Sequence, residues 1–280
     1  MVQKIVTLMA GLAITAGAQA QFSANFEAPL YTGSPAGTLR TGQNGWYLPA
    51  VAGSQDATVN TYANNAFGFV QNPTGGDQFA VTRFGNLNPA RGQHAIDFSQ
   101  GDIFTASFDF AGDRFGGSLP SSNNIGSFSL QNSASARFFQ TLYTWDDLAT
   151  GNAMDASYIY FDASGTQVTS LPGPEWDALR LNTWYRSTTT WSFATNQILS
   201  VSIDNLHDAL PPTVVDVSGM GWYLAGGANP TLPRPTDIRI FGSGAGNNVN
   251  QMGWDNITVV PSPAGFMALG LAGLAGLGRR

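Results

Sequence analysis

Apolar and polar side chains alternate along several segments between residues 22 and 260. Ile103–Phe110 follows this pattern, and so does Ser157–Phe161, which leads into a turn sequence at Asp162–Gly165. Because successive side chains of a strand point to opposite faces, a period of two predicts half-buried β-strands. Further strands are predicted at Gln78–Phe84, Ser127–Gln131, Asp237–Phe241 and Met252–Val259.

One pair of segments predicts a β-hairpin. Trp184–Phe193 is followed by the polar residues Thr195–Gln197 and then by the alternating segment Ile198–Asp204. Helical spacing of apolar residues is confined to Trp176–Leu181, where we expect a single turn of helix. The pattern therefore predicts an all-β fold, an antiparallel two-sheet sandwich formed by one domain at 21–259.

The composition supports strands joined by polar loops. Charged residues make up 11% of the chain, against about 25% in typical soluble domains. Aromatic residues make up 12%, and there are 33 glycines. Cysteine is absent, so the fold uses neither a disulfide nor a thiolate metal site.

The distribution of charge argues against nucleic acid as a partner. Residues 21–260 contain nine arginines and all 18 acidic residues, which leaves nine net negative charges. A protein that binds a phosphate backbone needs a basic surface instead.

The first twenty residues read as a secretory signal. Lys4 supplies the positive charge, an apolar stretch runs from Ile5 to Ala18, and Ala18-Gln19-Ala20 forms a small-x-small cleavage pattern. We therefore expect a signal helix at 1–20, cleavage between Ala20 and Gln21, and export. The alternative is an N-terminal membrane anchor, for which the apolar stretch is short.

The C-terminal segment 260–280 is organised as a tail. Pro261-Ser262-Pro263 is expected to break the last strand, since proline cannot donate to a sheet ladder. The apolar stretch Phe266–Gly278 follows, about 20 Å long as a helix, and Arg279-Arg280 closes the chain. We expect an apolar helix that engages the membrane, with the arginines on the cytoplasmic side; a buried core helix is the alternative.

This tail resembles the PEP-CTERM sorting signal of Gram-negative bacteria. The order of Pro-x-Pro motif, apolar stretch and terminal arginines matches, while Ser262 stands where that family has glutamate. The resemblance implies processing by an exosortase, transient anchoring in the inner membrane, and delivery to the outer cell surface or the extracellular space. The Ser262 difference leaves open the processing enzyme and the cut site.

The central domain resembles the concanavalin A-like lectin/glucanase jelly roll, the group that includes laminin-G-like domains. The matching segments are Asn25–Pro29 with Gly42–Trp46, the Trp184–Ile203 hairpin, and Gly253–Ile257. The resemblance implies that the two-sheet sandwich is a lectin-like jelly roll and that, as in related carbohydrate-binding sandwiches, it holds a structural calcium ion.

Glu27 and Asp255 are the candidate calcium ligands. The first and last strands of a jelly roll lie side by side, which would bring these two carboxylates together. Ca²⁺ takes six to eight oxygen ligands, and carboxylates are the most frequent. The alternative is that both acids cap strand ends at the surface.

Two catalytic arrangements are conceivable. Asp146, Asp147, Glu175 and Asp177 could supply the opposed carboxylates of a glycosidase, although such residues in loops also form ordinary turns. A lyase could use His94 near Arg91 with Tyr143 or Tyr185, although isolated histidines, here His94 and His207, usually make ordinary hydrogen bonds.

Sugar binding requires an aromatic face with hydrogen-bonding groups beside it. The aromatic residues expected in loops or at strand edges are the candidates: Trp46, Tyr47, Trp145, Trp176, Trp222 and Tyr223. Trp184, Trp191 and Trp254 lie in predicted strands and are expected in the core.

Three functions remain open at this stage. The first is a non-catalytic surface or matrix protein that binds extracellular polysaccharide. The second is a secreted polysaccharide lyase or glycosidase, and the third is a purely structural envelope protein.

Overall fold

The structure, a computed structural model, describes residues 21–33, 38–39, 42–51, 53–64, 67–83, 89–114, 123–229, 233–242 and 250–262. The expectations for a signal helix, Ala20, Pro263, the apolar tail helix, Arg279 and Arg280 lie outside these ranges. No helix within them is long and apolar enough to cross a membrane.

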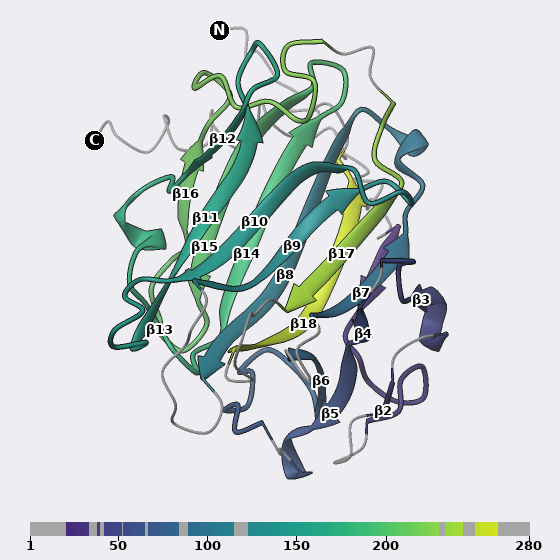
Figure 1. Cartoon of the computed structure of the whole chain (residues 1–280), viewed down its shortest axis with the longest axis vertical. Helices are drawn as coiled ribbons and strands as arrows, with labels where there is room; N and C mark the ends of the chain where they lie inside the picture. Colours follow the sequence, from purple (N-terminus) through teal and green to yellow (C-terminus); the bar gives the residue numbers. More distant parts are fainter. Residues whose placement is uncertain are drawn as a thin grey trace, which may run out of the picture.

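Two sheets stack face to face (Figure 1). Within the described ranges, neighbouring strands of the first sheet are, in spatial order, β16 (Thr213–Asp216), β15 (Gln197–Asn205), β14 (Tyr185–Ser192), β8 (Ile103–Arg114), β18 (Asn250–Pro261), β6 (Gln78–Arg83), β5 (Thr58–Thr61) and β2 (Thr38–Leu39). Strand β1 (Phe22–Ala24) pairs separately with β18. The first strand thus lies beside the last, as the sequence predicts.

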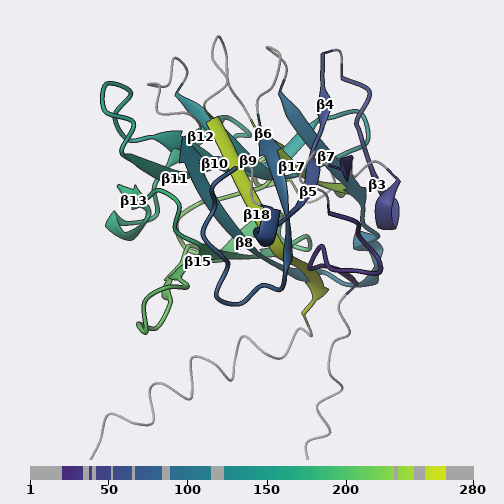
Figure 2. The ribbon, with the colours of Figure 1, turned by 90° about the horizontal axis from the view of Figure 1, so that it is seen from below.

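The second sheet contains β12 (Gln167–Ser170), β11 (Ala153–Phe161), β10 (Arg137–Trp145), β9 (Asn124–Gln131), β17 (Asp237–Gly242), β7 (Ala90–Ala95) and β3 (Trp46–Tyr47). Strand β13 (Leu179–Arg180) adds to β11, and β4 (Gln55–Asp56) adds to β7. Pairing is antiparallel throughout the described strands except between β4 and β7. Seen from below, β15 and β8 lie on the opposite side of the molecule from β12 and β10 (Figure 2).

Short 3-10 helices, rather than α-helices, interrupt the described strands: η1 (Gln43–Gly45), η2 (Tyr62–Asn64), η3 (Phe98–Gln100) and η5 (Pro174–Trp176). The all-β, two-sheet antiparallel sandwich predicted from the alternation is therefore confirmed. The helical turn expected at Trp176–Leu181 is wrong. The 3-10 turn ends at Trp176, and β13 follows because Leu179 and Arg180 pair with Met154 and Ala153.

Aromatic side chains fill the space between the sheets. Phe108 of β8 stacks on Phe128 of β9 with ring centroids 4.2 Å apart, and Phe110 meets Tyr143 of β10 at 4.4 Å. Alternate residues of each strand supply these contacts, which leaves the residues between them for the outer faces. Burial of such large rings is the main stabilising contribution in a sandwich that has few charges.

The last strand is longer than predicted. Strand β18 continues through Pro261, which pairs with Phe104, and the Ser262 amide donates to the Ile103 carbonyl at 2.8 Å. The Ser262 hydroxyl also lies 3.0 Å from the Thr105 hydroxyl. The strand nevertheless ends at Pro261, within the Pro-Ser-Pro motif that was predicted to break it, because proline has no amide to donate to the ladder.

Candidate functional site

A bulge in β18 creates the first candidate site. Asp255 is opposite Asp109 of β8, but the next aligned pair is Thr258 with Ser107, so the register shifts between them. Asn256 within the bulge has a φ of 46°. On the other edge, β18 pairs with β6 up to Trp254 and with β1 from Ile257. The bulge therefore lies where the strand changes partner.

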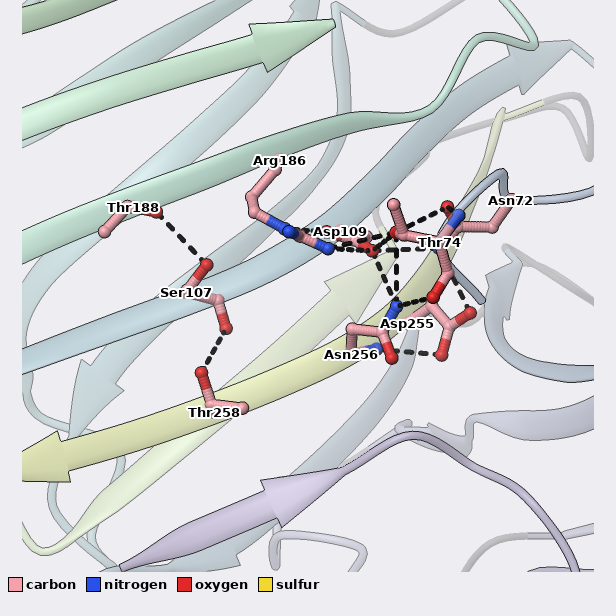
Figure 3. A network of polar contacts seen from close by, with 9 residues as sticks. All are labelled: Asn72, Thr74, Ser107, Asp109, Arg186, Thr188, Asp255, Asn256 and Thr258. Carbon is pink, nitrogen blue, oxygen red and sulfur yellow. Dashed lines mark hydrogen bonds and ion pairs between the residues drawn. The ribbon is translucent and has the colours of Figure 1, made fainter. Parts of the chain in front are cut away.

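Three carboxylates and one guanidinium gather here, and we call Glu27, Asp109, Asp255 and Arg186 the carboxylate cluster. Arg186 of β14 reaches Asp109 with its Nε at 2.7 Å and its Nη2 at 3.0 Å (Figure 3). The Asp109 Oδ2 also accepts hydrogen bonds from Asn72, Thr74 and Asn256. Asp109 is therefore fully engaged by the protein.

Asp255 and Glu27 have fewer partners. Asp255 accepts from the Asn256 amide at 2.8 Å and from Asn72 Nδ2 at 3.1 Å, while Glu27 accepts from the Gln78 amide at 2.8 Å. Their carboxylates lie against Gly75 and Gly76, and neither glycine has room for a Cβ. The two carboxylates thus lie against consecutive glycines of one loop.

The electrostatics of the cluster are unbalanced, because one arginine faces three carboxylates. Burial raises the pKa of Asp255 well above its ordinary value, and the neighbouring Asp109 and Glu27 raise it further. Burial and the same three acids also raise the pKa of Tyr62. Oxygen donors with excess negative charge are the donor set that Ca²⁺ prefers, and Glu27 and Asp255 are the two acids here that would hold such an ion. With Asp109 they do not form a group whose carboxylate oxygens all lie within 4.8 Å of one another; among the described residues that holds for Asp146, Asp155 and Asp177.

A groove on the outer face of the second sheet is the second candidate site. It has a volume of about 520 Å³ and crosses β7, β17, β9 and β10. Arg91, Arg137 and Arg239 line it, with Phe241 and five neutral polar residues: Asn124, Ser127, Gln131, Ser135 and Gln140. The inward neighbours Phe128, Leu130, Ile238 and Ile240 are core residues, which is why the polar ones face outward.

A continuous hydrogen-bond network organises one end of the groove. Arg239 donates to Gln93 Oε1 from Nε at 2.8 Å and to the Ser135 hydroxyl at 2.6 Å. Gln93 in turn donates to the Tyr47 hydroxyl at 2.7 Å, and Tyr47 donates to Asp237 at 2.5 Å. Burial and the Asp237 hydrogen bond raise the pKa of Tyr47 to about 12. The network holds Arg239 in one orientation.

The structure corrects most of the aromatic assignments. Trp46, Trp145, Trp176 and Trp222 are at most 5% exposed, so the expectation that they lie open to solvent is wrong. The indole nitrogens of the first three donate to Tyr31, Asn250 and Tyr158, respectively. Trp222 stacks on Tyr160 with ring centroids 4.2 Å apart. These rings face the core because polar partners there satisfy their N–H groups or an adjacent ring covers them.

The two tyrosines keep some exposure but lie apart. Tyr47 belongs to the network at the groove, whereas Tyr223 bridges Phe161 and Gln197 at the other end of the second sheet. Trp184, Trp191 and Trp254 are buried, as predicted.

The lyase arrangement is not brought together. The His94 nitrogens lie 2.7 Å from the Ala95 carbonyl and 3.0 Å from the Asn44 carbonyl, and its ring packs on Phe22. Arg91 lies three residues earlier on the same strand and so points to the opposite face. Tyr143 is buried in the core, and Tyr185 accepts from the Arg180 amide.

The glycosidase candidates converge only in part. Asp146 and Asp177 have carboxylate oxygens within 4.8 Å of each other and of Asp155, which the sequence reasoning missed. Asp147 instead accepts from the Ala149 amide within a turn. Glu175 lines a separate cavity of about 390 Å³, with Arg180, Tyr185 and Asp208.

The sequence also gave no indication of Arg137, Arg239 and Gln93; of the three groove arginines, only Arg91 was a candidate. They lie on strands whose sequences are polar on one face, and their only signal was that outward position. Their convergence depends on strand order, because β7, β17 and the β9–β10 hairpin are neighbours in space but distant from one another along the chain.

The fold places the chain in the class of two-sheet β-sandwich proteins. No protein-family model and no curated protein matches the sequence. Among solved structures, the lectin UEA-II complexed with galactose is 12% identical with a TM-score of 0.48, covering 85% of this chain and 97% of that one. The cellulose-induced protein Cip1 is 11% identical with a TM-score of 0.48, covering 86% and 97%. The carbohydrate esterase vb_24B_21 of Shiga toxin-encoding bacteriophage phi24B is 14% identical with a TM-score of 0.47, covering 88% and 100%.

Proposed function

We propose that this protein is an exported, non-catalytic surface or matrix protein whose groove binds extracellular polysaccharide. The observation that carries the proposal is the groove itself, about 520 Å³ in volume and lined by guanidinium, amide and hydroxyl groups beside Phe241. Such groups bind sugar hydroxyls and a ring face, and at neutral pH they do not exchange protons as a glycosidase acid or base must.

Export and sorting belong to the same proposal and rest on the sequence. The signal pattern ending at Ala20 and the tail from Pro261 to Arg280 support delivery through the inner membrane, with an exosortase-type enzyme processing the tail. Sequencing the N-terminus of the secreted protein tests this, because a start at Gln21 supports cleavage and a start at Met1 contradicts it.

Blocking the groove without changing its charge tests polysaccharide binding. Ser127 of β9 lines the groove, so we expect Ser127→Trp to fill it and to lower affinity for a bound polysaccharide at least tenfold. Affinity electrophoresis through polysaccharide-containing gels measures the change. The matched control is Ser202→Trp on β15 of the other sheet, which should bind like the wild type.

Two results would contradict the proposal. One is equal binding by both variants, and the other is the absence of binding to a broad glycan array by residues 21–262. Shortened or unsaturated oligosaccharides among the products would replace it with the lyase or glycosidase alternative.

We further propose that Glu27 and Asp255 hold a structural Ca²⁺ ion in the carboxylate cluster. Calcium at about a hundredfold above its dissociation constant should stabilise the fold by about 2.7 kcal/mol. For a domain of this size that corresponds to a rise in Tm of roughly 5–10 °C.

Differential scanning calorimetry with calcium and with a chelator measures this effect. Asp255→Asn should lose most of the calcium-dependent rise, whereas Asp208→Asn, the same change in an exposed ion pair, should keep it. A Tm that is the same with calcium and with chelator would refute the metal site and leave the polysaccharide proposal untouched.

A further inference from the structure

The three groove arginines have only neutral hydrogen-bond partners in the described part of the chain. Arg239 donates to Gln93 and Ser135, Arg137 donates to Gln140 and Gln167, and Arg91 donates to Ser54 and lies over the Phe241 ring, 5.1 Å from its centroid. All of these acceptors are amide or hydroxyl oxygens. Three positive charges thus share one groove without a carboxylate bound to any of them.

Three of the described arginines outside the groove pair with aspartates, whereas Arg114 donates to the Thr150 carbonyl and Arg83 lies over the Phe67 ring. Within the described ranges, the ion pairs are Arg180–Asp208, Arg186–Asp109 and Arg234–Asp102. Asp237 is the acid whose charge acts on Arg239, but its carboxylate accepts hydrogen bonds from Tyr47 and Thr236. None of the described groove-lining residues is acidic. The groove is therefore a local positive region in a body with nine net negative charges.

Placing three partly buried guanidinium groups close together is energetically unfavourable. Burial lowers the pKa of Arg91 and of Arg137, and burial with repulsion from Arg91 lowers the pKa of Arg239 to about 10. The Nε atoms of Arg91 and Arg137 are buried and have no hydrogen-bond acceptor among the residues that the structure describes. An anion bound in the groove would supply the missing negative charge.

We infer that the groove selects an acidic polysaccharide, with the guanidinium groups of Arg91, Arg137 and Arg239 binding its carboxylate or sulfate groups. The inference rests on the proposed polysaccharide binding and names the class of polymer. Guanidinium forks bind planar carboxylates and sulfates through two parallel hydrogen bonds. The amides of Gln131 and Gln140 then contact the sugar between the charged groups.

Matched pairs of polymers test the inference on the protein from Gln21 to Arg280. Polygalacturonate is compared with its fully methyl-esterified form, and dextran sulfate with dextran, by isothermal titration calorimetry. We expect at least tenfold tighter binding to the acidic member of one pair, and the pair that responds distinguishes carboxylate from sulfate recognition. Affinity should fall as salt rises from 0.15 to 0.5 M, because ion pairs with the polymer are screened.

Substitutions test whether the groove arginines bind the acidic polymer. Arg137→Gln and Arg239→Gln should each lower affinity for the acidic polymer about tenfold or more, and Arg137→Lys should lower it less. Arg180→Gln removes a surface charge outside the groove and should have no effect. Thermal melts of every variant show whether a loss of binding follows from unfolding.

The outcomes separate this inference from the polysaccharide proposal. Equal, salt-independent binding to both members of each pair, abolished by Ser127→Trp, would overturn acidic selectivity and preserve polysaccharide binding. Acidic binding that survives all the groove substitutions would place the polyanion elsewhere and overturn the inference. Failure to bind any polymer would overturn both.

Discussion

Arg186→Gln should lower the free energy of unfolding by about 3 kcal/mol at neutral pH without calcium, measured by urea denaturation. Arg186 is the only cation in the carboxylate cluster, and Asp109, with which it pairs, is completely buried. Removing one partner of a buried ion pair costs about 3–5 kcal/mol, because the remaining charge is uncompensated. Because the Arg186 side chain is 35% exposed, we expect a loss at the lower end of that range.

The control is Arg180→Gln, which removes the same charge from an ion pair whose side chains are 62% and 43% exposed. Exposed pairs contribute about 0–1 kcal/mol, so this variant should be nearly as stable as the wild type. Equal losses in the two variants would show that Arg186 does not neutralise the cluster.

The effect of Arg186→Gln should also depend on pH. The raised pKa of Asp255 means that the folded state binds a proton more tightly than the unfolded state does. The stabilisation from that proton is complete below the ordinary value of 3.8 and is lost as pH rises through the raised pKa. Without Arg186 the ionised form is still less favourable, so the difference from wild type should grow as pH rises.

Trp145→Ala should lower the free energy of unfolding by about 3–5 kcal/mol, the range for removing a buried large aromatic ring. Trp145 is 2% exposed, and its indole nitrogen donates to Asn250 Oδ1 at 3.1 Å. The substitution therefore creates a cavity between the sheets and removes a buried hydrogen bond. Urea denaturation followed by the fluorescence of the remaining tryptophans measures the loss.

Leu210→Ala is the matched control for an apolar truncation, because Leu210 is 73% exposed and should tolerate the change. The result also decides between the two roles considered for Trp145. A variant that keeps wild-type stability and loses polysaccharide binding would restore this tryptophan as a sugar-stacking residue and contradict its place in the core.

The strands with strict alternation were predicted well. The predicted segments Ile103–Phe110 and Asp237–Phe241 correspond to β8 (Ile103–Arg114) and β17 (Asp237–Gly242). Strand β10, which contains the sequence Arg-Phe-Phe-Gln, was missed, because Phe138 and Phe139 interrupt the alternation where its register with β9 shifts. Strand β7 was missed because Arg91, Gln93 and His94 read as a polar loop.

The tryptophans show why the local sequence alone did not predict which residues are buried. A tryptophan near turn-forming residues was taken to be exposed, yet Trp46 and Trp176 are buried by Tyr31 and Tyr158, which lie 15 and 18 residues away. Burial depends on which segments pack together, and alternation within one strand carries no information about the partner that covers it.

What the sequence determined by itself is the class of fold, since alternation along a strand is a local property that fixes which side chains face a common core. It also placed Glu27 and Asp255 near the first and last strands of the sandwich. The tertiary structure alone decided how these acids meet, because the bulge at Asp255 and the glycines at 75 and 76 make room for both carboxylates. It also decided that Arg91, Arg137 and Arg239 share one groove, because three strands distant along the chain bring their outer faces together only after the sheet has formed.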